Sequence, residues 1–450
     1  MTAGERDSSS LDGESRDPDL LALLTAAEMR ELERIAFAEG VVVERVVMES
    51  AGRSAAEAVA GDFPEGPVVA AVGRGNNGGD AIVALRSLAA WGREVLAVPV
   101  GGAELSPELT HGWEIPIGEP SAFANAGVIV DGILGTGASG PPRAPIAEAV
   151  EAMNRCCRPI VALDGPTGVD LTTGAVPGAA IRAAMTVTFG AVKRGLLLFP
   201  GRSLAGRILL AEVGFPPIAP GGFAAALITD VWACRQMPRV APDAHKGEVG
   251  WVGVVAGRGG EGGAAIMAAM GALRAGCGGV RVVSAEANRL AIHAAVPEAV
   301  FLDRESRESI EGLHRTAALL IGPGIGTDEK ARSLLESVVS QFEGPMLFDA
   351  DALTLVGKDP SLLPTDASPR SVLTPHPGEL ARLLGRSTAD ILDDRFGAAS
   401  EAAAKFRCTV LAKGAPSLVA TPGQPVLVGT TGYSGVATGG MGDTLAGVIA

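Results

Sequence analysis

Short apolar runs, each bounded by glycine, proline or charged residues, alternate along the chain with longer segments in which apolar residues recur every three or four positions. The runs have the length of buried strands, and the longer segments have helical periodicity. This alternation predicts parallel sheets with helices on both faces, because parallel strands are joined by crossover helices. In the first half we expect strands at residues 68–72, 95–100, 128–130, 160–163 and 186–189, and helices at 80–91 and 146–155.

The rhythm lapses near Pro238 and Pro242, a stretch whose composition is typical of a linker. We therefore expect an α/β protein with two domains. The chain ends at Ala450 within an apolar helical pattern that carries no cap, so we expect the natural chain to continue. The expected organisation is a disordered lead-in at 1–19, a first domain at 20–230, a linker at 231–245, and a second domain at 246–450 with strands at 251–256, 280–284, 319–321, 346–348, 372–373 and 409–411 and a helix at 264–275.

Composition narrows the class of protein. The net charge of −14 opposes the phosphate backbone of nucleic acid, so we expect no nucleic-acid partner. The mean hydropathy is +0.29, but the apolar runs are shorter than the roughly 18 residues of a spanning helix, so we expect no membrane partner. Residues 1–19 lack the apolar core of a secretory signal, and the five cysteines form no CxxC pair. These features favour a cytoplasmic protein with buried thiols.

A glycine-rich loop at residues 73–80 follows one expected strand and precedes a helix. Backbone amides at such a helix start can approach a diphosphate, although Asn and Gly also form ordinary turns. Two later strands end at Asp131 and Asp164, where an open parallel sheet binds its ligands. Asn77, Asp131 and Thr167 offer hard oxygen ligands for a monovalent or divalent cation. Asp164 can bind a ribose or act on a substrate, and capping is the alternative for both aspartates.

Four motifs occur in the order NNGGD, DGILGTG, DGPTGVD and LLLFPG, and together they resemble the YjeF N-terminal domain over about residues 20–230. The resemblance implies a K⁺-assisted epimerase that interconverts the R and S forms of hydrated NADH and NADPH. We expect a Rossmann-like three-layer α/β/α sandwich for this domain, with Asp164 as the implied catalytic residue and Asn77, Asp131 and Thr167 as the implied potassium ligands. The implied substrate-binding residues are Asn76, Asn77, Gly78, Gly79, Asp80, Gly135, Thr136, Gly137, Ala138, Ser139, Gly140, Pro141 and Asp164.

Two positions depart from the family pattern. Ala81 follows NNGGD where the family usually has glycine, and Gly165 follows Asp164 where the family usually has isoleucine. Thr167 replaces the usual serine but keeps the hydroxyl. Because glycine adds backbone freedom, we expect Gly165 to loosen the loop that holds Asp164, which affects the epimerase rate more than ligand binding.

A second glycine cluster, Gly-Gly-Met-Gly-Asp at residues 439–443, opens the last helical segment. Bare amides at a helix start can hold a transferring phosphoryl group, and Asp443 can accept the proton of an attacking hydroxyl. The alternative for Asp443 is an N-cap of that helix. His376 lies between two prolines in a loop that can point its imidazole into a cleft or bond it to the backbone. Other glycine-rich or polar segments, each expected to end a strand, are 245–247, 257–265, 322–326, 349–353, 374–379 and 413–415.

This series, with TPHPGE, DADAL and GGMGD in order, resembles the ribokinase-like ADP-dependent NAD(P)H-hydrate dehydratases over about residues 236–450. It implies a ribokinase-like α/β domain in which Asp443 is the catalytic base. Asp349 and Asp351 either steer Mg²⁺ through water or cap a helix, and the alternative for Lys413 is a solvated surface lysine. The implied contacts with the hydrated nucleotide are Ala265, Gly324, His376 and Asp443, and the implied ADP site comprises Lys413, Gly414, Ala415, Pro416, Ser417 and Gly442.

The two resemblances together imply a bifunctional repair enzyme. The first domain would epimerise NADH-hydrate and NADPH-hydrate, and the second would phosphorylate the C6 hydroxyl of the S epimer and eliminate phosphate. The implied cofactors are ADP, Mg²⁺ and K⁺, and we expect a homo-oligomer. The residues do not decide between ADP and ATP, and only the bacterial resemblance favours ADP. The alternative is an ATP-dependent vitamin-precursor kinase of the ribokinase-like superfamily with a non-catalytic nucleotide-binding N-terminal module.

Overall fold

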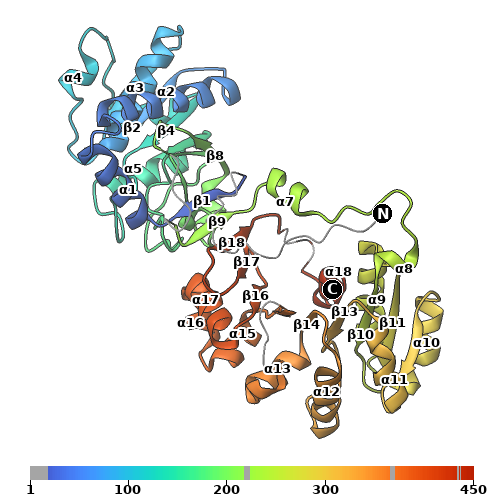
Figure 1. The fold of residues 1–450 in the computed structure, drawn as a ribbon. Coiled ribbons are helices and arrows are strands. Elements are labelled where there is room, and N and C mark those ends of the chain that lie inside the picture. Colours follow the sequence, from blue (N-terminus) through green and yellow to red (C-terminus); the bar gives the residue numbers. More distant parts are fainter. Residues whose placement is uncertain (1–18, 217–222, 365–369, 433–434, 436) are drawn as a thin grey trace. The chain divides into compact units, whose positions relative to one another are not determined.

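The chain divides between Thr229 and Asp230 into two compact units, shown in the ribbon of Figure 1. No helix in the described part of the chain is long and apolar enough to cross a membrane. The expected disordered lead-in at 1–19 lies outside the described residues, except for Asp19. The structure is a computed structural model that describes residues 19–216, 223–364, 370–432, 435 and 437–450.

The first unit is built on a six-stranded parallel sheet in the order β3-β2-β4-β5-β6-β8. The chain passes from β2 outward to β3 and then returns to build β4, β5, β6 and β8 on the other side. The point where the order reverses therefore lies between β2 and β4, and the carboxyl ends of these two strands are where such a sheet binds ligands. The five expected strands are confirmed, and the bounds are β2 (Val68–Val72), β3 (Val95–Pro99), β4 (Val128–Gly132), β5 (Ile160–Leu163), β6 (Met185–Phe189) and β8 (Arg207–Ala211).

Helices cover both faces of this sheet, as its apolar strands require. Val68, Ala70 and Val72 of β2 belong to one buried cluster that includes residues of α2 and α3, whereas Val69 and Ala71 belong to a second cluster that includes α5. The expected helix at 80–91 begins earlier, at Asn76, so NNGGD forms its first turn. The remaining elements are α1 (Ala26–Ala38), α2 (Glu44–Asp62), α3 (Asn76–Ala90), α4 (Pro107–Thr110), η1 (Pro120–Asn125), α5 (Ile146–Arg155), η2 (Arg194–Leu196), α6 (Arg202–Ala205), and the small strands β1 (Leu21–Leu24), β7 (Val192–Lys193) and β9 (Ala225–Leu227).

The second unit has the strand order β12-β11-β10-β13-β14-β15-β16-β17-β18. Strands β12 to β16 are parallel, and β17 and β18 are antiparallel additions. The chain builds β10, β11 and β12 in one direction and β13 to β16 in the other, so the switch point lies between β10 and β13. The bounds are β10 (Trp251–Val255), β11 (Gly279–Ser284), β12 (Val300–Asp303), β13 (Ala318–Ile321), β14 (Met346–Phe348), β15 (Ser371–Leu373), β16 (Thr409–Ala412), β17 (Ser417–Ala420) and β18 (Val426–Gly429).

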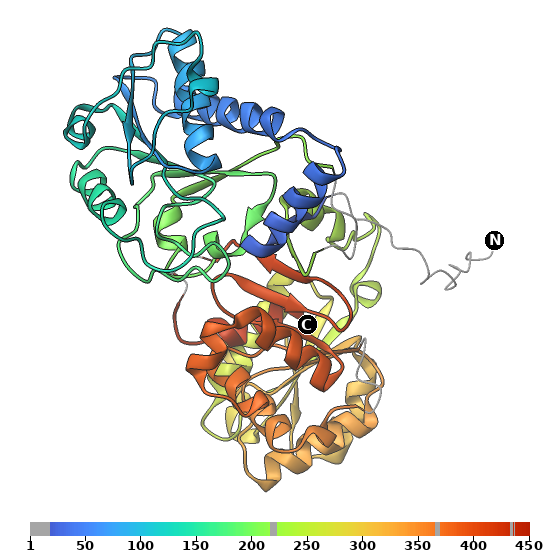
Figure 2. The same ribbon diagram turned by 90° about the vertical axis from the view of Figure 1, so that its left-hand side faces the viewer.

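Two helices of the second unit, α9 and α18, pack unusually closely. A Cβ at Gly271 of α9 would lie 2.4 Å from Thr444 O, and one at Gly447 of α18 would lie 2.0 Å from Ala268 O. These glycines let α18, the helix that carries Asp443, pack closely against α9. Figure 2 shows the ribbon of this unit, with its orange and red helices, from another side. The helices are α7 (Asp230–Gln236), α8 (Lys246–Val249), α9 (Gly262–Ala275), η3 (Glu286–Asn288), α10 (Arg289–Ala295), α11 (Arg307–Glu311), η4 (Gly312–Arg315), α12 (Glu329–Gln341), α13 (Asp351–Lys358), η5 (Pro360–Leu362), α15 (Pro377–Leu384), α16 (Thr388–Asp393), α17 (Arg395–Phe406) and α18 (Met441–Ile449).

The segment around residues 231–245 differs from the sequence expectation in two ways. Its first part is helical, because α7 occupies Asp230–Gln236. His245 does not end a strand but follows an irregular stretch and is the N-cap residue of α8. Its neighbours Lys246 and Gly247 begin that helix, so this segment is not placed at a sheet edge as the sequence suggested.

Candidate active sites at the two switch points

The loops that follow β2 and β4 touch each other at the switch point of the first unit. The backbone N–H of Gly73 donates to Gly132 O (3.0 Å), and Asn77 Nδ2 donates to Leu134 O (3.0 Å). A Cβ at Gly73 would lie 2.0 Å from Ile133 O, so only glycine permits this approach. The NNGGD and DGILGTG motifs, more than fifty residues apart in sequence, therefore form one site.

Asn77, Asp131 and Thr167, the residues expected to bind potassium, lie together at this point. Asp131 is fully buried, its Oδ1 accepts a hydrogen bond from Thr167 Oγ1 (2.8 Å), and its Oδ2 accepts one from Thr167 N (2.8 Å). Burial raises the pKa of Asp131 to about 6, although hydrogen bonds from Thr167 and Ile133 work in the opposite direction. Asn77 Oδ1 is buried and has no hydrogen-bond partner among the described residues. This carboxylate and this free amide oxygen suit a hard cation.

Asp164, the expected catalytic residue, is held in an uncommon backbone conformation. Its φ is +63°, and the N–H of Gly165 donates to Leu163 O (2.7 Å), which closes a γ-turn around it. Asp164 Oδ2 accepts a hydrogen bond from Thr136 N (3.1 Å). A Cβ at Gly165 would lie 2.3 Å from Leu171 Cδ2. Gly165 therefore sits in a tightly packed turn, and the carboxylate that it was expected to loosen is fixed by hydrogen bonds.

The residue that fixes Asp164 most strongly is Lys193, which sequence reasoning missed. Lys193 is 1% exposed, and its Nζ donates to Asp164 Oδ1, to Phe189 O (2.7 Å) and to Thr188 Oγ1 (3.1 Å). An ammonium group is buried to this extent only when it is paired and hydrogen-bonded. The signal in the sequence was a lysine in an otherwise apolar run just before LLLFPG, in a chain with only six lysines.

Two further carboxyl groups lie close enough to Asp164 to affect one another. Burial, together with the charges of Asp164 and Glu33, raises the pKa of Asp80 well above its usual range. Burial and the charge of Asp164 likewise raise the pKa of Glu33 of α1. Glu33 was not singled out from the sequence, because nothing near it forms a motif. The cluster contains three acids and one buried ammonium, so protonated and ionised carboxyl groups can lie side by side.

The three acids, Asp164, Asp80 and Glu33, line a cavity of about 480 Å³ in the first unit. The volume is suited to a nucleotide-sized ligand. Gly78 and Gly79 lie on the buried side of α3 and do not line it, and Ser139, Gly140 and Pro141 are exposed beyond its rim. Arg30, Phe37 and Phe215 line it without having been expected. The expected residues that do line it are Asn76, Asn77, Asp80, Gly135, Thr136, Gly137, Ala138 and Asp164.

In the second unit, Lys413 joins several of the expected motifs. Its Nζ lies 2.7 Å from Asp349 Oδ1 and 3.8 Å from Glu379 Oε2, and it would lie 3.6 Å from a Cβ at Gly442. Asp349 Oδ1 also accepts a hydrogen bond from Thr374 Oγ1 (2.8 Å). The alternative of a solvated surface lysine is wrong, since the Lys413 side chain is only 17% exposed. DADAL, TPHPGE, KGAPS and GGMGD thus converge on one ammonium group.

Asp443 lies in the first turn of α18, beside this cluster. The N-cap residue of α18 is Gly440, with φ +83° and no side-chain cap hydrogen bond, so the alternative that Asp443 caps this helix is wrong. Burial, and next the charge of Asp349, raises the pKa of Asp443 to about 6, although Lys413 lowers it. Asp443 makes no hydrogen bond to another described residue. Its carboxylate is therefore free to meet a substrate.

His376 and the two other expected contacts with the hydrated nucleotide lie in different environments. His376 Nδ1 accepts a hydrogen bond from Gly378 N (3.0 Å), so the alternative of a backbone-bonded histidine is confirmed for this nitrogen. Its Nε2 is left as the donor, in a side chain that is half exposed. Gly324 faces the start of α9, where a Cβ would lie 3.4 Å from Ala264 Cβ. Ala265 is fully buried, so only its backbone is available to a ligand.

Asp351 and Asp349 do not cap α13, because the N-cap residue is Ala350 and it makes no side-chain cap bond. Asp351 Oδ2 instead accepts a hydrogen bond from Gly326 N (2.9 Å) and ties the loop after β13 to α13. Asp349 is engaged by Lys413 and Thr374, as described above. The capping alternative for both aspartates is therefore wrong, and both act as anchors of loops at the sheet edge.

The loop at 413–417, expected to bind ADP, rests on a partly buried arginine that sequence reasoning also missed. Arg395 Nη2 donates to Pro416 O (2.8 Å) and would lie 2.5 Å from a Cβ at Gly414. Burial lowers the pKa of the Arg395 guanidinium. Ser417 Oγ donates to Gly414 O (3.1 Å), which closes the turn from the other side. Ala415 lies between these two supports, so the loop has a fixed shape.

Each unit thus places carboxylates, a paired lysine and glycine-rich helix starts at the carboxyl ends of the strands of an open parallel sheet, which defines a two-domain α/β enzyme with two small-molecule sites. Residues 44–195 match the family described as YjeF-related protein N-terminus, and residues 252–450 match NAD(P)H-hydrate dehydratase. The chain is 36% identical to the bifunctional NAD(P)H-hydrate repair enzyme Nnr of Moorella thermoacetica, over 95% of this chain and 87% of that protein. It is 35% identical to the Escherichia coli enzyme of the same name, over 84% of this chain and 74% of that protein. The chain belongs to the family of bifunctional NAD(P)H-hydrate repair enzymes.

Among solved structures, the second unit is similar to the ADP/ATP-dependent NAD(P)H-hydrate dehydratase from Bacillus subtilis co-crystallised with ATP and Mg²⁺, with 28% identity and a TM-score of 0.42 over 49% of this chain and 77% of that one. The family membership confirms both resemblances drawn from the motifs. It also decides against the vitamin-precursor kinase alternative, because both halves match proteins of NAD(P)H-hydrate repair.

Proposed function

We propose that the first unit interconverts the R and S epimers of hydrated NADH and NADPH and that the second unit converts the S epimer back to NAD(P)H with ADP. The observation that carries the proposal is the position of Asp443, whose pKa is raised to about 6, at the glycine-rich start of α18 beside Lys413. A carboxylate with a pKa close to neutral pH is suited to remove a hydroxyl proton. Joining both activities in one chain lets a stereospecific site consume both epimers.

In the proposed dehydration, Asp443 accepts the proton of the C6 hydroxyl while this oxygen attacks the terminal phosphoryl group of ADP. The bond from that phosphorus to AMP breaks, and the amides at Gly439 to Gly442 hold the charge that develops on the transferring group. The C6–O bond then breaks with help from the ring nitrogen, and phosphate leaves with the electron pair. Loss of the C5 proton completes NAD(P)H, so ADP ends as AMP and phosphate.

The binding residues are part of this proposal. His376 Nε2, Gly324 and the backbone of Ala265 would hold the hydrated nicotinamide nucleotide. Lys413, Gly414, Ala415, Pro416, Ser417 and Gly442 would hold ADP. Mg²⁺ would accompany the ADP phosphates and supply positive charge to them. The described residues contain no cluster of three His, Cys, Asp or Glu side chains that could hold a metal ion. Asp349 accepts a hydrogen bond from Lys413, and Asp351 accepts one from the N–H of Gly326.

In the proposed epimerisation, Asp164 acts on the C6 centre of the hydrate in the cavity of the first unit. Lys193 holds the Asp164 carboxylate, and Asp80 lies near enough for its raised pKa to reflect the Asp164 charge. Asn77 Oδ1 and Asp131, with Thr167, would hold K⁺, which would supply positive charge close to the buried Asp131. The diphosphate of the substrate would meet the amides at the start of α3.

The test is recovery of reduced-nicotinamide absorbance from a mixture of R and S hydrated NADH with Mg²⁺ and K⁺, comparing ADP, ATP and no nucleotide. Complete recovery with ADP, faster than spontaneous epimerisation and absent in Asp443→Asn, is the expected result. Recovery of only half of the mixture would show dehydration without epimerisation, and no recovery by folded protein would overturn the proposal. The same assay decides between ADP and ATP.

We also propose that the protein acts in the cytoplasm as a homo-oligomer. A cytoplasmic pool of pyridine nucleotides would supply the hydrates that are its proposed substrates. The exposed apolar side chains of Val41, Val43 and Val46, each more than half exposed, support a surface for self-association. Light scattering after size-exclusion chromatography measures the assembly directly, and a monomer at micromolar concentration would contradict it.

A further inference from the structure

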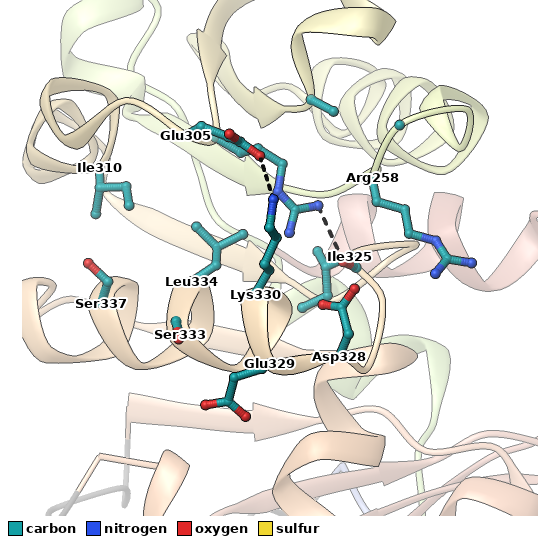
Figure 3. A pocket seen from close by; sticks show the side chains of 13 residues that line it. Arg258, Glu305, Ile310, Ile325, Asp328, Glu329, Lys330, Ser333, Leu334 and Ser337 are labelled. Carbon is teal, nitrogen blue, oxygen red and sulfur yellow. Dashed lines mark hydrogen bonds and ion pairs between the residues drawn. The ribbon is translucent and has the colours of Figure 1, made fainter.

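The second unit contains a cavity of about 570 Å³ that none of the expected site residues lines. Figure 3 shows it between the loop after β10, the loop after β12 and the first turns of α12. Arg304 follows β12, Ala285 follows β11, Arg258 follows β10 and Ile325 follows β13, so the cavity lies at the carboxyl ends of four neighbouring parallel strands. It therefore opens at the switch point of this sheet, where ligands of such folds bind.

Most charged groups that line the cavity already have partners. Lys330 Nζ lies 3.8 Å from Glu305 Oε1, and Arg258 forms an ion pair with Glu261 (2.7 Å). Asp328 caps α12 by accepting a hydrogen bond from Ala331 N (2.9 Å). Glu329 Oε1 lies 4.0 Å from Nη1 of Arg332, one turn further along α12. One charged side chain that lines the cavity has neither an ion pair nor a capping role among the described residues.

That group is Arg304. It has no carboxylate within 4.0 Å among the described residues, and the hydrogen bond found for its guanidinium is a long one from Nη1 to Ile325 O (3.3 Å). Its side chain is partly buried, and this burial lowers the pKa of Arg304, because a charged group loses hydration there. Figure 3 shows the Glu305–Lys330 pair and Ile325 at the wall of this cavity. The charges of Asp328, Glu305 and Asp303 act on this guanidinium without contacting it, so its N–H groups remain available for a hydrogen-bonded ion pair with an anion.

The cavity is continuous with the loop expected to bind the hydrated nucleotide. The N–H of Arg258 donates to Gly324 O (2.6 Å), and Ile325, the next residue, lines the cavity. The same loop is tied by Gly326 N to Asp351, whose charge contributes to the raised pKa of Asp443. A dinucleotide whose reacting ring lies at Asp443 and contacts Gly324 has a second nucleotide, and this cavity, on the other side of Ile325, is within the same loop region. The volume and position of the cavity, and the Arg304 guanidinium that contacts no carboxylate among the described residues, are suited to this second nucleotide.

We infer that this cavity binds the adenylyl half of the hydrated dinucleotide and that Arg304 contacts one of its phosphate groups. The inference rests on the proposed dehydratase activity of the second unit and adds to it a second point of recognition, remote from the reacting ring. Binding energy from such a remote group is available to hold the C6 hydroxyl in place at Asp443. The site would then favour whole dinucleotides over a mononucleotide that carries the same ring.

The experiment compares hydrated NADH, hydrated NADPH and the hydrate of reduced nicotinamide mononucleotide, which lacks the adenylyl half, as substrates of the whole chain. In Arg304→Gln we expect KM for both dinucleotides to rise about ten-fold, because a hydrogen bond to a charged group is lost, while KM for the mononucleotide stays unchanged. Arg304→Lys should restore part of the loss. Arg307→Gln is the matched control, since Arg307 is 89% exposed and does not line the cavity.

An equal rise of KM for all three substrates would show that Arg304 acts through the fold, and no rise for any would remove it from the site; either result overturns the inference. Calorimetric titration with ADP-ribose, with the ADP site saturated, tests the cavity without any turnover. If the wild type binds ADP-ribose and Arg304→Gln binds it about ten-fold more weakly, the inference stands even where no ADP-dependent recovery is seen, and only the proposed activity fails.

Discussion

Lys193 Nζ donates a hydrogen bond to Asp164 Oδ1, and the two side chains are almost fully buried against each other beneath the cavity of the first unit. Asp164 comes from the turn after β5, and Lys193 comes from the short strand β7. A buried ion pair is worth little compared with an apolar pair, but removal of one partner leaves an uncompensated charge. The pair therefore links the stability of this unit to the orientation of its expected catalytic carboxylate.

We expect Lys193→Met to lower the free energy of unfolding of the first unit by about 3 kcal/mol, because it leaves Asp164 buried without its counter-charge. We expect epimerisation to slow more than the loss of folded protein explains, since the carboxylate loses its main anchor. Urea unfolding followed by hydrogen exchange in peptides of the first unit measures the first effect, and chromatographic separation of R and S hydrates measures the second.

The matched control is Arg207→Met, which breaks the exposed ion pair between Arg207 and Asp62. That change should lower the free energy of unfolding by less than about 1 kcal/mol, because solvent screens the charges of an exposed ion pair. If Lys193→Met costs no more than the control and leaves the epimerisation rate unchanged, the buried pair has no role beyond filling space.

The potassium site gives a prediction that does not depend on turnover. Asn77 Oδ1 is buried without a hydrogen-bond partner among the described residues, next to a buried carboxylate. We expect K⁺ to raise the melting temperature of the wild type in a concentration-dependent way, since a ligand that binds only the folded state stabilises it. Asn77→Ala should lose this response.

Asn76→Ala is the control for the potassium prediction, because Asn76 is exposed and its Nδ2 donates to Glu44 on the other side of the loop (2.9 Å). It should keep the K⁺ response of the wild type. Equal responses of wild type and Asn77→Ala, with Na⁺ as effective as K⁺, would show general salt stabilisation and contradict a built site.

Replacement of Asp443 by Asn should lower the rate of ADP-dependent dehydration by about a thousand-fold, because the amide cannot accept the hydroxyl proton. Asparagine has the same shape as aspartate, and the change removes no helix cap, since Gly440 and not Asp443 is the N-cap residue of α18. Epimerisation by the first unit should be unaffected. Asp393→Asn, at an exposed position at the end of α16, is the control and should leave both rates unchanged. A comparable loss of epimerisation would point to misfolding.

Most strands of both sheets could be predicted closely from the sequence, because each is a short apolar run that a parallel sheet buries on both faces. The edge strands β8 and β12 and the antiparallel strands β17 and β18 were not predicted. The glycine loop after β2 could be found because it stands directly after such a run, and Asp443 could be found because it belongs to a glycine cluster that opens a helix. Lys193 and Arg395 could not, because each becomes functional only through a partner far along the chain, Asp164 and Pro416 respectively. The cavity at Arg304 also escaped prediction, since the glycine-rich segments 257–265 and 322–326 form only part of its wall and the loop after β12 and the start of α12 carry no motif.

Capping was the point where local sequence reasoning failed most clearly. An aspartate before a helical pattern is a good candidate for an N-cap, yet Asp349, Asp351 and Asp443 cap nothing. Tertiary partners hold the first two, and the third has none among the described residues. Local propensity describes what a residue can do in an isolated helix, whereas the sheet edge brings distant charges to it.

The pH dependence of dehydration follows from the raised pKa of Asp443, about 6 in the folded protein against 3.8 for a free aspartate. Asp443 must be ionised to accept a proton, so kcat/KM should be constant above about pH 7 and fall ten-fold per pH unit below about pH 6. The free energy of unfolding falls as the pH rises from about 4 to about 6, because burial and the neighbouring carboxylates favour the protonated form of Asp443 in the folded protein. Asp443→Asn, which mimics that form, should therefore unfold at higher urea concentration than the wild type at pH 8, and the difference should disappear as the pH falls through 6 towards 4. A rate profile that stays flat to pH 5, or a mutant less stable than the wild type at pH 8, would show that Asp443 is not a base whose pKa is raised by burial.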